Sequence, residues 1–125
     1  MRLPEDDEAY LNEKGFTWEL VPGGPGGYLI LRNVPICAGK YDQDHTDLLI
    51  MIPGGYNQTQ LDMFWTDPPL RLKNGEYPPA ATLFESHLGR TWQRFSRHLA
   101  SWRPGLDGLP MFLALIQGEL QERSA

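Results

Sequence analysis

The chain has 125 residues, 41% of them hydrophobic and 22% charged, which is the composition of one folded domain and not of a disordered segment. The formal net charge of -5 argues against nucleic-acid binding over the whole surface, and the single cysteine, Cys37, excludes an internal disulfide and zinc motifs built from several cysteines. No apolar run has the length of a membrane span, and the first residues lack the apolar core of a signal peptide. We therefore expect one cytoplasmic domain over residues 1–125.

The first half of the chain predicts a short helix followed by three strands. Pro4 suits the first turn of a helix, the acidic run at residues 5–8 complements the positive end of the helix dipole, and Lys14 and Gly15 end the helix. Apolar residues then mark strands, which are separated by segments rich in glycine and proline. The predicted strands cover residues 16–20, 28–32 and 48–52. The last of them is apolar without alternation, which is typical of a strand covered on both faces.

The second half predicts one interrupted strand and one long helix. Residues 62–66 and 70–72 have strand character on either side of two prolines, whereas residues 73–91 are mostly irregular in pattern. Residues 109–121 have apolar side chains at helical spacing, which predicts one buried stripe. The stripe consists of Leu109, Phe112, Leu113, Ile116 and Leu120. Strands grouped between terminal helices indicate an α+β fold, a four-stranded antiparallel meander with an N-terminal helix and a long C-terminal helix.

Two loops contain residue types found in ligand sites but lack the rest of the motif. The glycine-rich segment at residues 22–27 has no Lys-Ser/Thr pair and no predicted helix after it, both of which a phosphate-binding loop needs. The acidic cluster around His45 has Asp47 and Pro53 where a calcium-binding EF-hand loop needs glycine and glutamate. We therefore expect neither a metal site nor a cofactor.

Residues 89–102 form the densest polar and aromatic segment. If this segment is extended, Arg94, Ser96 and His98 share one face, and Ser96 with His98 could form a hydroxyl nucleophile and its base. If it is helical, Arg94 and His98 align and Ser96 points elsewhere. Spacing alone favours a third interpretation, a surface segment whose tryptophans anchor the core, because no group that would orient the histidine is visible.

The same region is locally basic, because residues 86–106 contain four arginines and no acidic residue. Together with Trp92, Phe95 and Trp102, these arginines fit a nucleic-acid surface, an acidic protein surface or the binding of a peptide tail. Four arginines are few for binding phosphates, and the acidic remainder of the chain repels them. The sequence therefore argues against nucleic acid as the partner.

The landmarks occur in the order of the ubiquitin-conjugating-enzyme (UBC) fold, and the chain resembles the divergent bacterial members of that fold, of the prokaryotic family E type. The turn Pro53-Gly54-Gly55-Tyr56-Asn57 resembles the Pro-x-x-Tyr-Pro of the family, with asparagine in place of the last proline. Trp102-Arg103-Pro104 resembles its Trp-x-Pro, and the long helix follows. The string Trp92-Gln93-Arg94-Phe95-Ser96-Arg97-His98 looks like the signature of the bacterial group. The resemblance implies a UBC-like fold over nearly the whole chain.

Two features of ordinary family members are missing from the sequence. Arg94 stands where the family's catalytic cysteine lies relative to Trp102, and the His-Pro-Asn motif, whose asparagine helps to stabilise the oxyanion, does not occur. His87 is only a loose positional substitute for that motif. Cys37 precedes the core strands and has only Lys40 close in sequence, so we interpret it as an inert, half-buried thiol and not as the displaced nucleophile.

The resemblance implies that a hydroxyl group can replace the thiol. The protein would then be a transferase of conjugating-enzyme type, in which Ser96 carries the C-terminus of a ubiquitin-like protein as an oxyester. His98 would act as the general base, and Arg94 or Arg97 would stabilise the oxyanion.

The same resemblance also allows a catalytically inactive adaptor that binds the ubiquitin-like protein or its activating enzyme. In both cases the implied setting is a bacterial ubiquitin-like modification pathway. The implied partners are a ubiquitin-like protein, an activating enzyme of the ThiF type and a peptidase of the JAB type. We expect Trp92, His87 and the arginines at 94 and 97 to contribute to binding.

Overall fold

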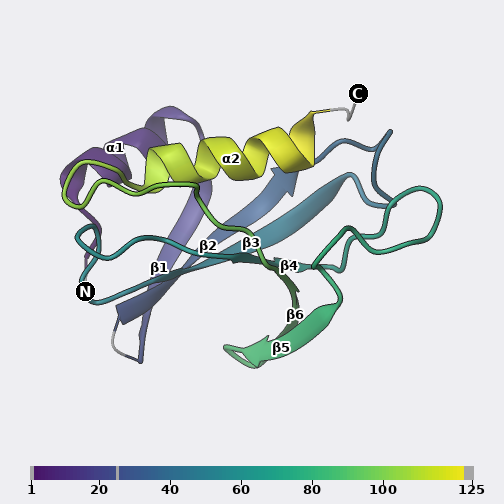
Figure 1. The fold of residues 1–125 in the computed structure, drawn as a ribbon, viewed down its shortest axis with the longest axis horizontal. Coiled ribbons are helices and arrows are strands. Elements are labelled where there is room, and N and C mark those ends of the chain that lie inside the picture. Colours follow the sequence, from purple (N-terminus) through teal and green to yellow (C-terminus); the bar gives the residue numbers. More distant parts are fainter. Residues whose placement is uncertain (1, 25, 123–125) are drawn as a thin grey trace.

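The computed structural model describes residues 2–24 and 26–122, which form two helices and six strands (Figure 1). The helices are α1 (Glu5–Glu13) and α2 (Leu109–Gln121). The strands are β1 (Thr17–Gly23), β2 (Gly26–Pro35), β3 (His45–Ile52), β4 (Phe64–Asp67), β5 (Leu83–His87) and β6 (Arg90–Phe95). Both predicted helices are confirmed. Neither helix of this described part combines the length and the apolar character that crossing a membrane requires.

The six described strands belong to one antiparallel sheet in the order β1-β2-β3-β4-β6-β5. The α+β fold is confirmed, and the first four strands follow one another as a meander. The prediction of a four-stranded sheet is wrong, because β6 pairs with β4 and β5 lies outside β6. Residues 70–72 are not a strand, since Leu72 forms only an isolated bridge with Tyr41.

Residues 73–82 of the segment 73–91 are irregular, as predicted. The sequence does not predict the β5–β6 hairpin, which begins at Leu83 and continues to Phe95. Its turn consists of Leu88 and Gly89, which have φ values of 55° and 75°. Positive φ at both central residues is the signature of a type I′ turn, for which Asn-Gly is the usual sequence. Because leucine rarely adopts this conformation, the sequence contains no recognisable hairpin signal.

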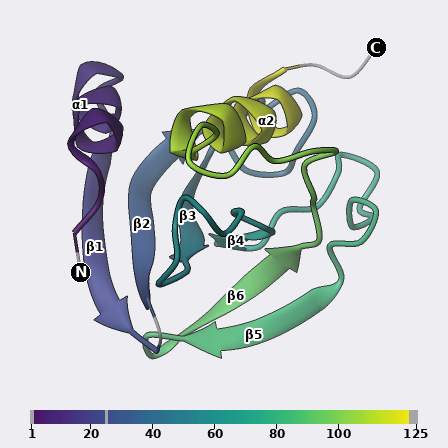
Figure 2. The ribbon, with the colours of Figure 1, turned by 60° about the vertical axis from the view of Figure 1, so that its left-hand side comes forward.

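Both helices pack on the same face of the sheet and close the main hydrophobic core (Figure 2). The predicted stripe of α2 is confirmed, because all five of its residues are buried. From the sheet, alternate residues of the strands meet the helices. These residues are Leu29 and Leu31 of β2, Leu48 and Ile50 of β3, Phe64 of β4 and Phe95 of β6. Burying each such side chain stabilises the fold by about 1.5–3 kcal/mol, which is enough to fix the helices on the sheet.

The opposite face of the sheet has a smaller apolar cluster. It consists of Ile30, Leu49, Trp65 and Trp92, which alternate with the residues of the main core along their strands. The sheet coils so that Tyr28 in β2 reaches His87 at the end of β5, with ring centroids 5.8 Å apart. Apolar residues on both faces explain why residues 48–52 are apolar without alternation, as predicted.

The N-terminal end of α2 is held by two side chains from other parts of the chain. The Leu109 backbone N–H donates a hydrogen bond to Tyr56 Oη at 2.6 Å, and Tyr56 donates to Oδ2 of Asp7 in α1 at 2.5 Å. Burial is the main cause that raises the pKa of Asp7 above its ordinary value, and burial also raises the pKa of Tyr56. Tyr56 therefore acts as the hydrogen-bonded link between the two helices.

Candidate functional site

Ser96 follows β6 directly and is half-buried. Its backbone N–H donates a hydrogen bond to the Ala80 carbonyl at 3.0 Å, and the carbonyl of the next residue, Arg97, accepts one from the Met63 N–H at 2.9 Å. Ser96 is therefore held between the segment before β5 and the segment before β4. These long-range backbone contacts leave rotation about χ1 as the main freedom of the hydroxyl group.

The side chains around Ser96 alternate between the two faces of the sheet, as the extended interpretation predicts. Phe95 belongs to the main core, and Arg97 binds Glu119 of α2 with hydrogen bonds of 2.6 and 2.7 Å. Because side chains alternate along an extended chain, Ser96 and His98 project on the face away from α2. The helical alternative is wrong, since the chain up to Phe95 forms β6.

His98 is exposed and has a carboxylate beside it. Its Nδ1 is in contact with Oδ1 of Asp62. The other ring nitrogen, Nε2, has no hydrogen-bond partner in the described part of the chain, and no hydrogen bond there joins the Ser96 hydroxyl to His98. Sequence reasoning missed Asp62 because it lies 36 residues away along the chain.

The backbone partners of Ser96 and of Arg97 are both non-glycine residues in the left-handed region. Met63 has a φ of 60° and Ala80 a φ of 53°. For residues with a side chain this conformation is uncommon and costs roughly 1–3 kcal/mol. Such outliers concentrate at functional sites, and here one bonds to the backbone of Ser96 and the other to the backbone of the next residue. No sequence signal could have revealed them, because neither methionine nor alanine favours positive φ.

All four arginines of the basic segment are paired with carboxylates from other parts of the chain or from the following loop. Arg90 pairs with Asp47 and Asp67, Arg94 with Glu85, Arg97 with Glu119, and Arg103 with Asp107. The segment is therefore not a free basic surface, which removes the physical basis for binding a nucleic-acid backbone there. The sequence could not show this, because most of the pairing acids are distant along the chain.

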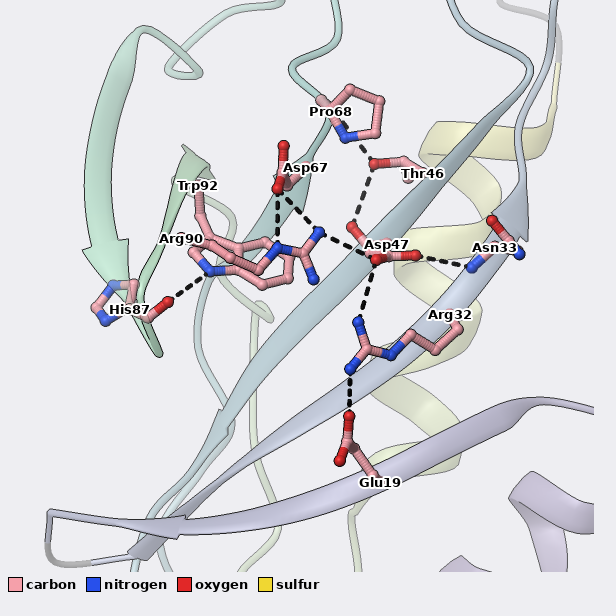
Figure 3. Close-up of polar contacts among 10 residues, drawn as sticks. All are labelled: Glu19, Arg32, Asn33, Thr46, Asp47, Asp67, Pro68, His87, Arg90 and Trp92. Carbon is pink, nitrogen blue, oxygen red and sulfur yellow. Dashed lines mark hydrogen bonds and ion pairs between the residues drawn. The ribbon is translucent and has the colours of Figure 1, made fainter.

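Asp47 is at the centre of a polar network that fixes the start of β6 (Figure 3). Its carboxylate accepts hydrogen bonds from Arg32 at 3.5 Å, from Arg90 at 3.0 Å and from the Asn33 N–H at 2.9 Å. Arg90 also binds Asp67 and lies over the ring of the buried Trp92, 4.3 Å from its centroid. The network joins β2, β3, β4 and β6 at the end of β6 remote from Ser96.

Arg94 pairs with Glu85, and the carboxylate of Glu85 also contacts the side chains of Trp65 and His87. Glu85 accepts hydrogen bonds from Trp65 Nε1 at 2.9 Å and from Arg94 Nη1 at 3.0 Å, and it lies 3.3 Å from His87 Nε2. The hydrogen bond from Trp65, then that from His87, and the Arg94 charge lower the pKa of Glu85. Among the described side chains, the buried Nε of Arg94 is an orphan donor, with no acceptor in reach.

The remaining residues singled out from the sequence are placed away from the Ser96 hydroxyl. Trp92 is fully buried, and its Nε1 donates to the His87 carbonyl at 3.0 Å, so its ring supports the second apolar cluster. Cys37 is half-buried, as predicted, and its backbone N–H donates to the Leu120 carbonyl at 2.8 Å. Its loop therefore caps the C-terminal end of α2, which lies on the other face of the sheet from the Ser96 hydroxyl.

An antiparallel sheet that carries both helices on one face is consistent with an E2-like α+β fold. The chain matches the family described as prokaryotic E2 family E over residues 3–123 and belongs to this family. The resemblance inferred from the sequence is thereby confirmed. No curated protein and no solved structure matches the chain.

Proposed function

We propose that this E2-like protein, acting as one domain over residues 1–125, carries the C-terminus of a ubiquitin-like protein as an oxyester on Ser96. One observation carries the proposal. Ser96 is hydrogen-bonded to Ala80 and the next residue, Arg97, to Met63, and both partners are held in a strained left-handed conformation. Such strain persists only where the surrounding structure enforces it, and it marks segments whose geometry serves a function.

The proposed reaction has two steps. The Ser96 hydroxyl attacks the C-terminal carbonyl of the ubiquitin-like protein, which a ThiF-type activating enzyme has converted with ATP to an adenylate or an ester. The new Oγ–C bond replaces the bond to the leaving group, and the hydroxyl proton passes through His98 Nε2 to the leaving group. An acceptor amine then attacks the oxyester, the Oγ–C bond breaks, and Ser96 regains a proton through His98. Serine needs this base because its hydroxyl group is a weak nucleophile at its ordinary pKa.

Of the two arginines considered for the oxyanion, Arg94 is the better candidate. Arg97 is engaged by Glu119 on the α2 side of the sheet, and it also donates to the Ser96 carbonyl at 3.0 Å. Arg94 lies on the same face as Ser96, and its Nε–H has no acceptor among the described residues. Because that Nε is buried, a substrate oxyanion would be met by the outer edge of the Arg94 guanidinium group, whose side chain is 24% exposed and which pairs with Glu85 through Nη1.

A non-catalytic adaptor is the second candidate function. It is favoured by one observation, that within the described residues the Ser96 hydroxyl makes no hydrogen bond to His98. In this case the domain binds the ubiquitin-like protein or its activating enzyme without a covalent intermediate, and His87 and Arg94 are the partly exposed candidates for contact. In either case a JAB-type peptidase would act in the same cytoplasmic bacterial pathway.

The test is to produce the protein together with a candidate ubiquitin-like protein and a ThiF-type activating enzyme, and to look for a covalent adduct. An oxyester on Ser96 is expected to resist thiols and to be cleaved by base. Ser96→Ala should abolish the adduct, and Ser96→Cys should give an adduct that thiols cleave. Ser101→Ala, which changes an exposed serine of the same region, is the matched control and should retain the adduct.

Three results would overturn the oxyester. An adduct that survives Ser96→Ala rules out this serine, and an adduct lost on Cys37→Ser restores a thiol mechanism. Complex formation without any covalent species, unchanged by Ser96→Ala and His98→Ala, establishes the adaptor instead.

A further inference from the structure

We propose that Asp62 is a positioning residue that fixes the His98 imidazole, with Nδ1–H directed at the carboxylate and Nε2 left free. The role of this histidine orientation in acyl transfer rests on the function proposed above. The orientation itself is a property of the folded chain alone, so it can be tested separately.

The backbone around Asp62 is held on both sides. Leu61 and Phe64 are almost completely buried, and between them Met63 is fixed in the left-handed conformation by its hydrogen bond to the Arg97 carbonyl. The residue before Met63 is therefore aligned with the residue after Arg97. This alignment places the Asp62 carboxylate beside the His98 ring, although the two side chains are 38% and 59% exposed.

The charges near His98 single out Asp62 as its partner. Arg97, the preceding residue, is turned toward Glu119 on the other face of the sheet. Among the described residues, the carboxylate of Asp62 is the only charged group in contact with the imidazole. The hydroxyl that would use this imidazole, Ser96, lies on the same face of the extended segment.

An ionised carboxylate only accepts hydrogen bonds, so a neutral imidazole beside it must carry its proton on Nδ1. The lone pair of Nε2 is then available as the base for a hydroxyl group. An unconstrained neutral histidine favours the other tautomer, with the proton on Nε2, in which this nitrogen cannot act as a base. Asp62 thus supplies the orienting group that a serine–histidine pair requires.

The tautomer of each histidine can be measured from the imidazole nitrogen-15 chemical shifts of the free protein at a pH where the rings are neutral. In the wild-type protein, His98 is expected to carry its proton on Nδ1. Asp62→Ala should move the proton to Nε2, and Asp62→Glu should restore the wild-type signature at least in part. The matched control is Asp44→Ala, which removes the carboxylate 3.1 Å from His45 Nδ1 and should leave the His98 signals unchanged.

Equal His98 shifts in the wild-type protein and in Asp62→Ala would overturn the orientation. The second measurement is the rate of oxyester formation, which should fall by at least about tenfold in Asp62→Ala and be partly rescued in Asp62→Glu. A changed tautomer with an unchanged rate would overturn the positioning role. If the wild-type protein forms no oxyester, the proposed function fails, while the nitrogen shifts still decide whether Asp62 orients His98.

Discussion

The guanidinium group of Arg97 binds both carboxylate oxygens of Glu119, at 2.6 and 2.7 Å, and joins the segment after β6 to the last turns of α2. Both side chains are 19% exposed, so water screens this pair less than a surface pair. Because Ser96 immediately precedes Arg97, the ion pair holds one side of the proposed site.

Removing this ion pair is expected to destabilise the fold. Arg97→Ala leaves the half-buried Glu119 carboxylate without its partner, which should lower the free energy of unfolding by about 1–3 kcal/mol. Urea unfolding of Arg97→Ala, Glu119→Gln and the double variant measures the coupling between the two residues. Strictly additive losses would mean that the two side chains do not interact in solution.

Relieving the strain in the β5–β6 turn is expected to stabilise the protein. Leu88 has a φ of 55°, so Leu88→Gly, or Leu88→Asn with the usual Asn-Gly turn, should raise the free energy of unfolding by about 0.5–1 kcal/mol. Gly89→Ala is the control and should destabilise the protein, because Gly89 has a φ of 75°. A Cβ at this position would meet no atom within 4 Å, so any loss of stability reflects the backbone conformation alone. A loss of stability in Leu88→Gly would show that the backbone of Leu88 is not strained in the turn.

A side chain at Gly26 is expected to disrupt the turn between β1 and β2. A Cβ at this position would lie 1.9 Å from the Ile52 carbonyl oxygen, a backbone atom that cannot move aside cheaply. Gly26→Ala should therefore destabilise the protein by about 1–3 kcal/mol or more in urea unfolding. Gly118→Ala, in α2 with no atom within 4 Å of the added Cβ, should instead stabilise it by about 0.5–1 kcal/mol.

The buried carboxylate of Asp7 is expected to weaken the fold at neutral pH. Burial raises its pKa above the ordinary value of 3.8, so at neutral pH the folded protein holds an ionised group that its surroundings disfavour. As the pH falls through the raised pKa, the folded state takes up a proton before the unfolded state does, and the penalty disappears. Asp7→Asn, which keeps an acceptor for Tyr56, should therefore raise the free energy of unfolding at pH 7.

This gain should shrink as the pH approaches 3.8, which urea unfolding at a series of pH values can follow. Glu5→Gln is the control, because Glu5 is an exposed acid of the same helical turn and should show no such gain, whereas the charge of Asp6 itself contributes to the raised pKa of Asp7. A gain for Asp7→Asn that is constant over pH would contradict the raised pKa.

The sequence predicts those parts of the fold that depend on local pattern. The periodicity of α2 gives both of its bounds, and the unbroken apolar run at residues 48–52 correctly indicates a strand buried on both faces. The β5–β6 hairpin escapes prediction because its turn uses Leu88, a residue that local preference excludes from that conformation.

For the candidate site, the sequence predicts the segment but not its surroundings. The order of motifs leads to Ser96 and His98, whereas Asp62, Met63 and Ala80 reach them only through the pairing of distant strands. The ion pairs of Arg90, Arg94 and Arg97 are hidden for the same reason, whereas Arg103 pairs with Asp107 four residues further along the chain. Local charge counting therefore suggests a basic surface that the folded chain neutralises.

The contacts that hold Ser96 all join residues far apart in the chain: its own N–H with Ala80, and the neighbouring Arg97 with Met63 and with Glu119. Contacts of this range form late in folding, because closing the intervening loops costs entropy before any contact is gained. We therefore expect the serine to be ordered only in a chain that has completed both the sheet and α2. A truncated or partly folded chain would then present no reactive hydroxyl group, so the proposed acyl transfer would be confined to fully assembled molecules.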